Sequence, residues 1–299
     1  MSVDTALTTQ PITGERSALP GRRRRVLRRL LRNPLAITSA VVLLVAIGLA
    51  VLAPVVAPYS PEQTDFANAL APPGTAGHLL GTDDLGRDVL SRILFGMRAS
   101  LLVAMLAVVT ALIFGVPLGL IAGYFRAVDG VISRLTDVML AFPFLILAVG
   151  LAAIRGASLS NAAIAIGIAQ IPGVIRVVRS DALRLKSLDF VGAAVADGAG
   201  DFWVLSRHIL PNATSVVLVQ ATVAIPVAIL GEAVLSFLGL GIQPPAPSLG
   251  TMLANAQQFA TRAPWAAVMP GIAIMLLALA FNVFGDSLRD ALDPKASRR

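Results

Sequence analysis

The sequence predicts an all-α integral membrane protein that crosses the bilayer six times. Of its 299 residues, 56% are hydrophobic and only 14% are charged, whereas a soluble domain usually carries about 25% charged residues. The mean hydropathy is +0.80, and the apolar residues gather in six runs. So few charges cannot cover a water-exposed surface of this size, and the same composition excludes intrinsic disorder.

Each run is close to the length that spans a membrane, because about 20 helical residues cross a hydrocarbon core of about 30 Å. Asn33 is a suitable N-cap for the first run, and Pro34 suits the first helical position. The fourth run is the least regular, since it contains Gln170 and Pro172, and Pro143 can bend the third. The expected spans are 35–57, 99–124, 138–154, 162–178, 213–240 and 266–284.

The arginines and lysines predict that both termini face the cytoplasm, because short cytoplasmic loops are enriched in these residues. In this orientation the cytoplasmic segments hold 19 of the 24 basic residues. Eight arginines lie in the N-terminal segment. We expect its basic run to rest against anionic membrane lipid, and we expect no nucleic-acid partner.

Two segments between the spans are too long to be simple connections. The outer one, 58–98, is predicted to contain an amphipathic helix capped by Thr82, with Asp83 and Asp84 in its first turn. On the polar face of that helix, Asp88 and Arg92 are expected to pair four residues apart.

The inner segment, 179–212, has 34 residues. It is predicted to form a short helix of small residues, a turn at Gly198 and a second helix that ends before Pro211. Small residues let the backbone of a partner approach closely, so the segment has the character of a docking element.

Other functions are excluded or disfavoured by what the sequence lacks. There is no cysteine, and His78 and His208 are the only histidines, so no metal cluster is expected. Neither of the two lysines, Lys186 and Lys295, follows the glycines of a phosphate-binding loop. The chain also has no catalytic motif for an intramembrane enzyme, and we do not expect an enzyme.

Four blocks in this order resemble the permease subunit of ABC importers of the dipeptide, oligopeptide and nickel class. They are HLLGTDDLGRDVLSRILFGMRASL (78–101), GAAVADG with HILPN (192–198 and 208–212), EAVLSFLGLGIQPPAPSLGTML (232–253) and PWAAVMPGIAIMLLALAFNVFGDSLRDALDP (264–294). The second block is similar to the EAA loop of that family, but Gly192 replaces its glutamate, a loss for which Asp189 is a candidate to compensate. The resemblance covers about 29–294 and fits the subunit with the longer N-terminal region.

The resemblance implies a type I ABC importer permease fold in the bacterial inner membrane. The partners it implies are a homologous second permease, two ATP-binding subunits and an extracytoplasmic substrate-binding protein. ATP and Mg²⁺ would be bound by the partner ATPases, and no cofactor is expected in this chain. The substrate would be a di- or oligopeptide, or a related solute such as a nickel chelate or glutathione.

The same resemblance divides the chain into five parts. These are a basic cytoplasmic segment (1–33), a first transmembrane helix (34–57), an extracytoplasmic segment (58–98), a core of five transmembrane helices (99–288) and a cytoplasmic tail (289–299). The coupling loop, 179–212, lies within the core.

The expected contacts with the ATPase all lie in this loop. They are Asp189, Phe190, Gly192, Ala193, Ala194, Asp197, Gly198 and Arg207.

The translocation pathway is marked more weakly, by polar residues within the spans. Gln170, Glu232 and Asn282 are candidates, although each can instead form a hydrogen bond between helices. The alternative function is an ATP-independent secondary carrier or channel, which would leave the long inner segment unexplained.

Overall fold

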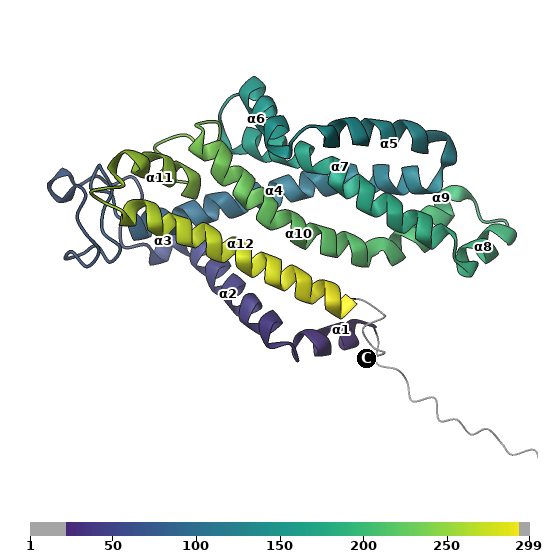
Figure 1. Cartoon of the computed structure of the whole chain (residues 1–299). Coiled ribbons are helices and arrows are strands. Elements are labelled where there is room, and N and C mark those ends of the chain that lie inside the picture. The colour runs from purple at the N-terminus through teal and green to yellow at the C-terminus, as the bar shows by residue number, and fades with distance from the viewer. Residues whose placement is uncertain (1–21, 293–299) are drawn as a thin grey trace, which may run out of the picture.

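The computed structural model describes residues 22–292, and this part of the chain folds into a bundle of helices without a β-sheet (Figure 1). Asn33 caps α2 as expected, since its side chain accepts a hydrogen bond of 3.0 Å from the Leu35 amide. The elements are α1 (Arg22–Leu30), α2 (Pro34–Val51), α3 (Ala53–Val56), η1 (Phe66–Asn68), α4 (Val89–Tyr124), α5 (Arg126–Ala141), α6 (Phe144–Arg155), α7 (Leu159–Lys186), α8 (Asp189–Ala196), α9 (Asp201–Val204), the π-helical turn η2 (Leu205–Ile209), α10 (Leu210–Phe237), α11 (Leu249–Ala256), η3 (Gln257–Phe259) and α12 (Trp265–Leu292).

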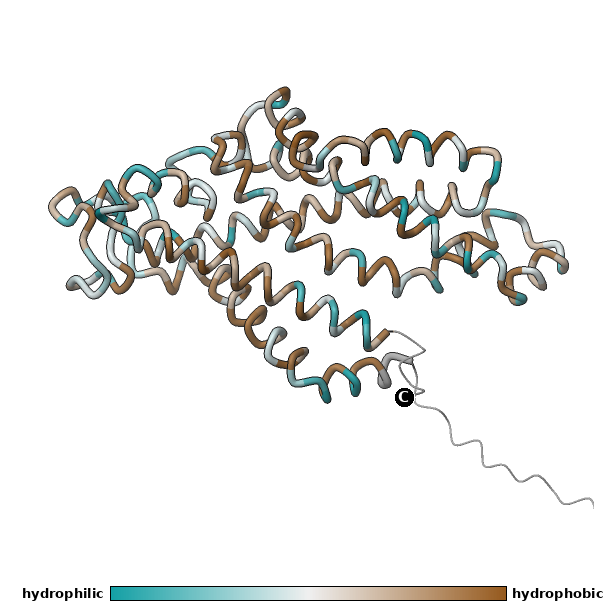
Figure 2. The backbone as a smooth tube through the Cα atoms, in the orientation of Figure 1, coloured by the Kyte–Doolittle hydropathy of each residue, from teal (hydrophilic) through white to brown (hydrophobic). Residues whose placement is uncertain are grey.

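The bundle has two ends of different construction (Figure 1). One end, called the α11 end, carries α11 and the connection between α3 and α4. The other, called the α8 end, carries α1, α8, α9 and the last turns of α12. Hydrophobic residues follow the helices between these ends, and hydrophilic residues collect at the ends (Figure 2). The distribution fits a bundle that stands across a bilayer.

Five helices are long and apolar enough to cross a membrane, and a sixth span requires α5 and α6 together. The third span was predicted as one helix over 138–154. This prediction is wrong, because the chain bends by 90° between α5 and α6. Pro143 explains the break, since proline cannot donate a backbone hydrogen bond and disfavours helical geometry in the residue before it. Phe142 is accordingly extended, with φ −86° and ψ 134°.

The predicted amphipathic helix beginning at Thr82 is also wrong. Helix α4 begins at Val89, and the Asp88 side chain caps it by accepting a hydrogen bond of 2.8 Å from the Ser91 amide. A helix cannot run through Gly86, whose φ of +73° is left-handed. From Val89 the helix continues without interruption into the second span.

The expected pair between Asp88 and Arg92 is not formed. The Arg92 guanidinium lies 3.4 Å from Oδ2 of Asp83 and donates to the carbonyl of Pro61 at 2.9 Å. Asp88 accepts from Ser91 and contacts the buried His78 ring at 3.0 Å. The carboxylates of Asp83 and Asp88 therefore hold the outer segment together, and neither forms the expected pair along one face of a helix.

Helices α4 and α7 approach closely along a row of glycines. A Cβ atom added at Gly115, Gly119 or Gly123 would lie 2.6–2.8 Å from a side-chain atom of Val174, Val178 or Ala182. The glycines recur every four residues, which is the spacing of a close helix–helix contact in membranes. This ridge fixes α7, from which α8 extends.

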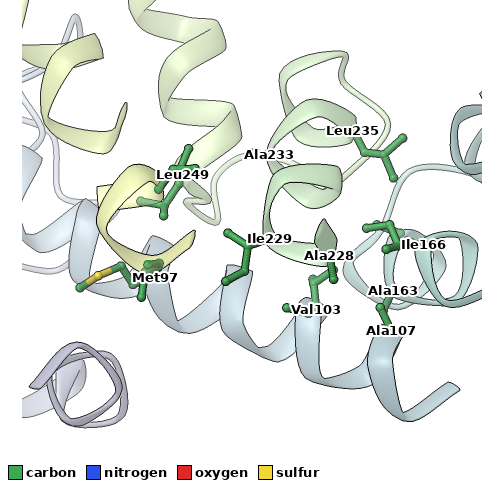
Figure 3. Packing of buried hydrophobic residues seen from close by; sticks show 14 of the residues in the cluster. Met97, Val103, Ala107, Ala163, Ile166, Ala228, Ile229, Ala233, Leu235 and Leu249 are labelled. Carbon is green, nitrogen blue, oxygen red and sulfur yellow. The ribbon is translucent and has the colours of Figure 1, made fainter. Parts of the chain in front are cut away.

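The core lies where α4, α7, α10 and α11 meet (Figure 3). Its labelled side chains include Val103 and Ala107 of α4, Ile166 of α7 and Ile229 of α10, all fully or almost fully buried. Leu249 of α11 joins them, so the short helix is packed into the bundle.

Candidate functional site

The predicted docking segment forms a helix, a glycine turn and a second short helix. The prediction that the second helix ends before Pro211 is wrong, because Pro211 lies in the first turn of α10, where proline is tolerated. Helix α8 ends at Ala196, and Gly198 follows with φ +83°, the left-handed geometry that ends many helices. Helix α9 begins at Asp201 and passes through η2 into α10. The segment is therefore a folded-back projection between α7 and α10 at the α8 end of the bundle (Figure 1).

Polar contacts attach this projection to the ends of α4 and α7. The Tyr124 hydroxyl donates to Asp201 at 2.8 Å, and Lys186 Nζ donates to the carbonyl of Tyr124 at 2.6 Å. The buried side chains of Val191, Val204 and Ile209 pack into the same cluster as Tyr124. These contacts fasten the projection to the ends of α4 and α7.

Five predicted contact residues line one hollow, which we call the α8–α9 hollow. It has a volume of about 690 Å³. Phe190, Ala193, Ala194, Asp197 and Gly198 line it from α8 and the turn. The sequence therefore predicted one side of the hollow, from residues of α8 and the turn that follows it.

The other side of the α8–α9 hollow is formed by residues that were not predicted as contacts. Trp203 and His208 line it, and their rings pack edge to face with centroids 4.7 Å apart. The Phe202 side chain beside them is 84% exposed. A signal was present in the sequence, because two aromatic residues in a water-facing segment are unusual unless a partner covers them.

Three other predicted contacts do not line the hollow. Gly192 is exposed on α8, and an added Cβ would meet no atom within 4 Å. Asp189 occupies the first turn of α8, where a carboxylate suits the helix dipole. Arg207 lies in η2 and is exposed. Within residues 22–292 neither Asp189 nor Arg207 has a hydrogen bond through its side chain.

The pathway candidates lie on three different helices, and no hydrogen bond joins any two of them in the described part of the chain. Gln170 of α7 is half-buried, and its Nε2 has no hydrogen-bond partner there. Glu232 of α10 is fully buried and accepts hydrogen bonds of 2.6 Å from Ser100 and Ser236. Asn282 of α12 is exposed.

Two family matches together cover most of the chain. Residues 115–298 match the family described as binding-protein-dependent transport system inner membrane component. Residues 21–73 match the N-terminal TM domain of oligopeptide transport permease C.

Whole-length relatives agree with these matches. The chain is 47% identical to a dipeptide transport system permease protein of Alkalihalophilus pseudofirmus, over 91% of this chain and 90% of the relative. It is 42% identical to a glutathione transport system permease protein of Pectobacterium atrosepticum, over 90% of this chain and 89% of the relative.

The fold is also that of a solved transporter. A chain from an inward-facing structure of the MetNI methionine ABC transporter superposes with a TM-score of 0.55 at 18% identity, over 67% of this chain and 97% of that one. Together with the membrane-spanning helices, these findings show that the chain belongs to the binding-protein-dependent transport system inner membrane components, the permease subunits of ABC importers, and is a multi-pass protein of the bacterial inner membrane.

Proposed function

We propose that this permease forms half of the translocation pathway of a peptide importer and that the α8–α9 hollow docks on an ATP-binding subunit. The substrate class is inferred from relatives named for dipeptide and glutathione transport. The partners are a second homologous permease, two ATP-binding subunits and an extracytoplasmic binding protein. ATP and Mg²⁺ are bound by the ATP-binding subunits, and the α8 end faces the cytoplasm.

The α8–α9 hollow is the observation that carries the docking proposal. Aromatic side chains exposed at the polar end of a membrane protein are costly in water and are enriched at protein interfaces. Phe202 and Trp203 are 84% and 51% exposed. The small side chains of Ala193 and Ala194 leave room for a partner beside them.

The attachment of the projection supports its use as a lever. When two ATP-binding subunits close, α8 and α9 would move with the surface on which they dock. The hydrogen bonds from Lys186 to Tyr124 and from Tyr124 to Asp201 would pass this motion to α4 and α7. Coupling of this kind joins two distant sites through an element with two positions.

Site-specific cross-linking tests the docking, and the natural absence of cysteine makes every introduced thiol unique. Val195→Cys places a thiol on an exposed position of α8. In the assembled complex we expect a reagent with one thiol-reactive end and one photoactivatable end to join it to an ATP-binding subunit, and we expect ATP to change the cross-linked yield. Ala76→Cys, exposed at the α11 end, is the matched control and should give no such product.

A substitution tests the coupling itself. Ala194→Arg places a long charged side chain in the hollow, so the complex should insert normally but lose peptide uptake, and its ATPase rate should no longer respond to the loaded binding protein. Normal uptake by this variant would refute the docking role. Gly192→Ala, on the same helix with open space around the new Cβ, should leave uptake unchanged.

A further inference from the structure

A second hollow at the α8 end has the features of a ligand site that the proposed coupling does not use. It lies between α7, α10 and α12, has a volume of about 470 Å³, and is called the α7–α12 hollow. Ligand sites are typically apolar clefts with a few convergent polar groups. Here valines 177, 216, 219 and 223 supply the apolar wall, and charged or amide side chains come from all three helices.

One buried polar group in this wall is incompletely paired. Asp181 is 7% exposed, and its Oδ1 accepts hydrogen bonds of 2.9 and 2.7 Å from the Arg184 guanidinium. Its Oδ2 has no hydrogen-bond partner among residues 22–292. A buried carboxylate oxygen without a donor is unfavourable, so the site favours a ligand that brings a cationic donor.

The opposite charge is present in the same hollow. Arg289 of α12 lines it, is exposed, and forms no ion pair or hydrogen bond within the described residues. Its guanidinium suits a carboxylate, which it can bind through two parallel hydrogen bonds. Gln220 and Asn212 of α10 add amide groups to the same lining.

We propose that the α7–α12 hollow binds a zwitterion of dipeptide size, with its ammonium at Asp181 and its carboxylate at Arg289. A sphere of 470 Å³ is about 10 Å across, and an extended dipeptide is about 7 Å long. The Gln220 amide and the side-chain oxygen of Asn212 can pair with the peptide bond of such a ligand, while the Asn212 Nδ2 keeps its hydrogen bond of 2.7 Å to the His208 carbonyl. The Arg184 side chain, 61% exposed, turns aside to admit the ammonium.

Because the hollow lies at the α8 end, its ligand is the peptide after import. The charged α7 residues of the hollow, Asp181 and Arg184, lie within three turns of Asp189, where α8 begins, and Asn212 follows η2 closely. A ligand in the hollow therefore bridges the two helices that carry the α8–α9 hollow. This inference rests on the proposed function, because it takes the α8 end to be cytoplasmic and the transported solute to be a peptide.

Equilibrium dialysis on the purified membrane complex, without its binding protein, tests the inference with three probes. These are radiolabelled L-alanyl-L-alanine, its N-acetyl derivative without the ammonium, and its C-terminal amide without the carboxylate. Because a hydrogen bond to a charged group contributes about tenfold or more in affinity, the zwitterion should bind at least about tenfold more tightly than either derivative.

Two variants assign the charges to residues. Asp181→Asn should abolish the preference over the N-acetyl derivative and keep the preference over the amide, whereas Arg289→Gln should do the reverse. Asp137→Asn, which removes a carboxylate from an exposed pair with Arg176, and Arg126→Gln, which removes an exposed arginine at the same end, should change neither preference.

Three results would overturn the site. The first is that no probe binds to the whole complex, as would happen if the second permease filled the hollow. The second is that all three probes bind equally. The third is that both variants leave the preference for the zwitterion intact. The comparison of probes on the unaltered complex does not depend on how the variants fold. If any of these results is found in a complex that still takes up peptide with ATP, the site is refuted but the proposed function is not. Absence of uptake would refute the proposed function separately.

Discussion

Glu232 shows how a single polar residue inside a span can be used for structure. Its carboxylate is fully buried and accepts hydrogen bonds of 2.6 Å from Ser100 of α4 and Ser236 of α10. The sequence identified it as a pathway candidate because charged residues within membranes are rare. The geometry favours the alternative given in the sequence analysis, a hydrogen bond between helices. A role of Glu232 in the pathway stays a prediction.

We expect Glu232→Ala to lower the free energy of unfolding by about 1–3 kcal/mol, because two buried serine hydroxyls lose their acceptor. Glu232→Gln keeps one acceptor oxygen and should lose less. Thermal unfolding of the purified complex in detergent measures both. A stable Glu232→Ala complex with altered substrate preference would contradict the structural role and support a place in the pathway.

Gly198 and Gly192 should respond differently to the same substitution. Gly198 has a left-handed backbone with φ +83°, which costs a residue with a side chain about 1–2 kcal/mol. Gly192 is inside α8 with open space around its missing Cβ, and alanine is favoured there by about 1 kcal/mol. Protease protection of the projection in the assembled complex should therefore fall in Gly198→Ala and hold or rise in Gly192→Ala. Equal protection in the two variants would contradict this assignment.

At the scale of elements, the glycine ridge of α4 decides whether α7 can pack. Gly119→Ala should prevent the close approach, because the new Cβ would lie 2.8 Å from Val178 Cβ and 2.9 Å from the Ile175 carbonyl oxygen. We expect a clear loss of monodisperse complex in size-exclusion chromatography. Gly130→Ala on α5, where nothing lies within 4 Å, is the matched control. An equal yield from both variants would show that the ridge can separate without penalty.

Several elements followed from local sequence rules, and others did not. Asn33 and Pro34 located the start of α2, and the small residues with Gly198 located the docking projection, because caps and turns depend on neighbouring residues. The break at Pro143 could be suspected from the sequence but its 90° bend could not, since the angle depends on packing. The start of α4 was missed because Thr82 and Asp83 form contacts within a loop instead of capping a helix.

At the scale of the whole molecule, composition and charge predicted the six-span plan, and the described helices agree if α5 and α6 form one broken span. The site was predictable in part. One side of the α8–α9 hollow comes from α8 and the turn after it, but Trp203 and His208 reach the hollow only through the fold of α9 and η2. The α7–α12 hollow could not be foreseen, because its residues come from three helices and are spread over more than a hundred residues of sequence.

The proposed function makes this chain half of a pathway that is driven by ATP hydrolysis in other subunits. Uptake of labelled dipeptide into proteoliposomes tests it most directly. With the second permease, the ATP-binding subunits and the loaded binding protein present, uptake should require ATP and should stop with Ala194→Arg. Uptake by this chain alone, without ATP or partners, would contradict the claim.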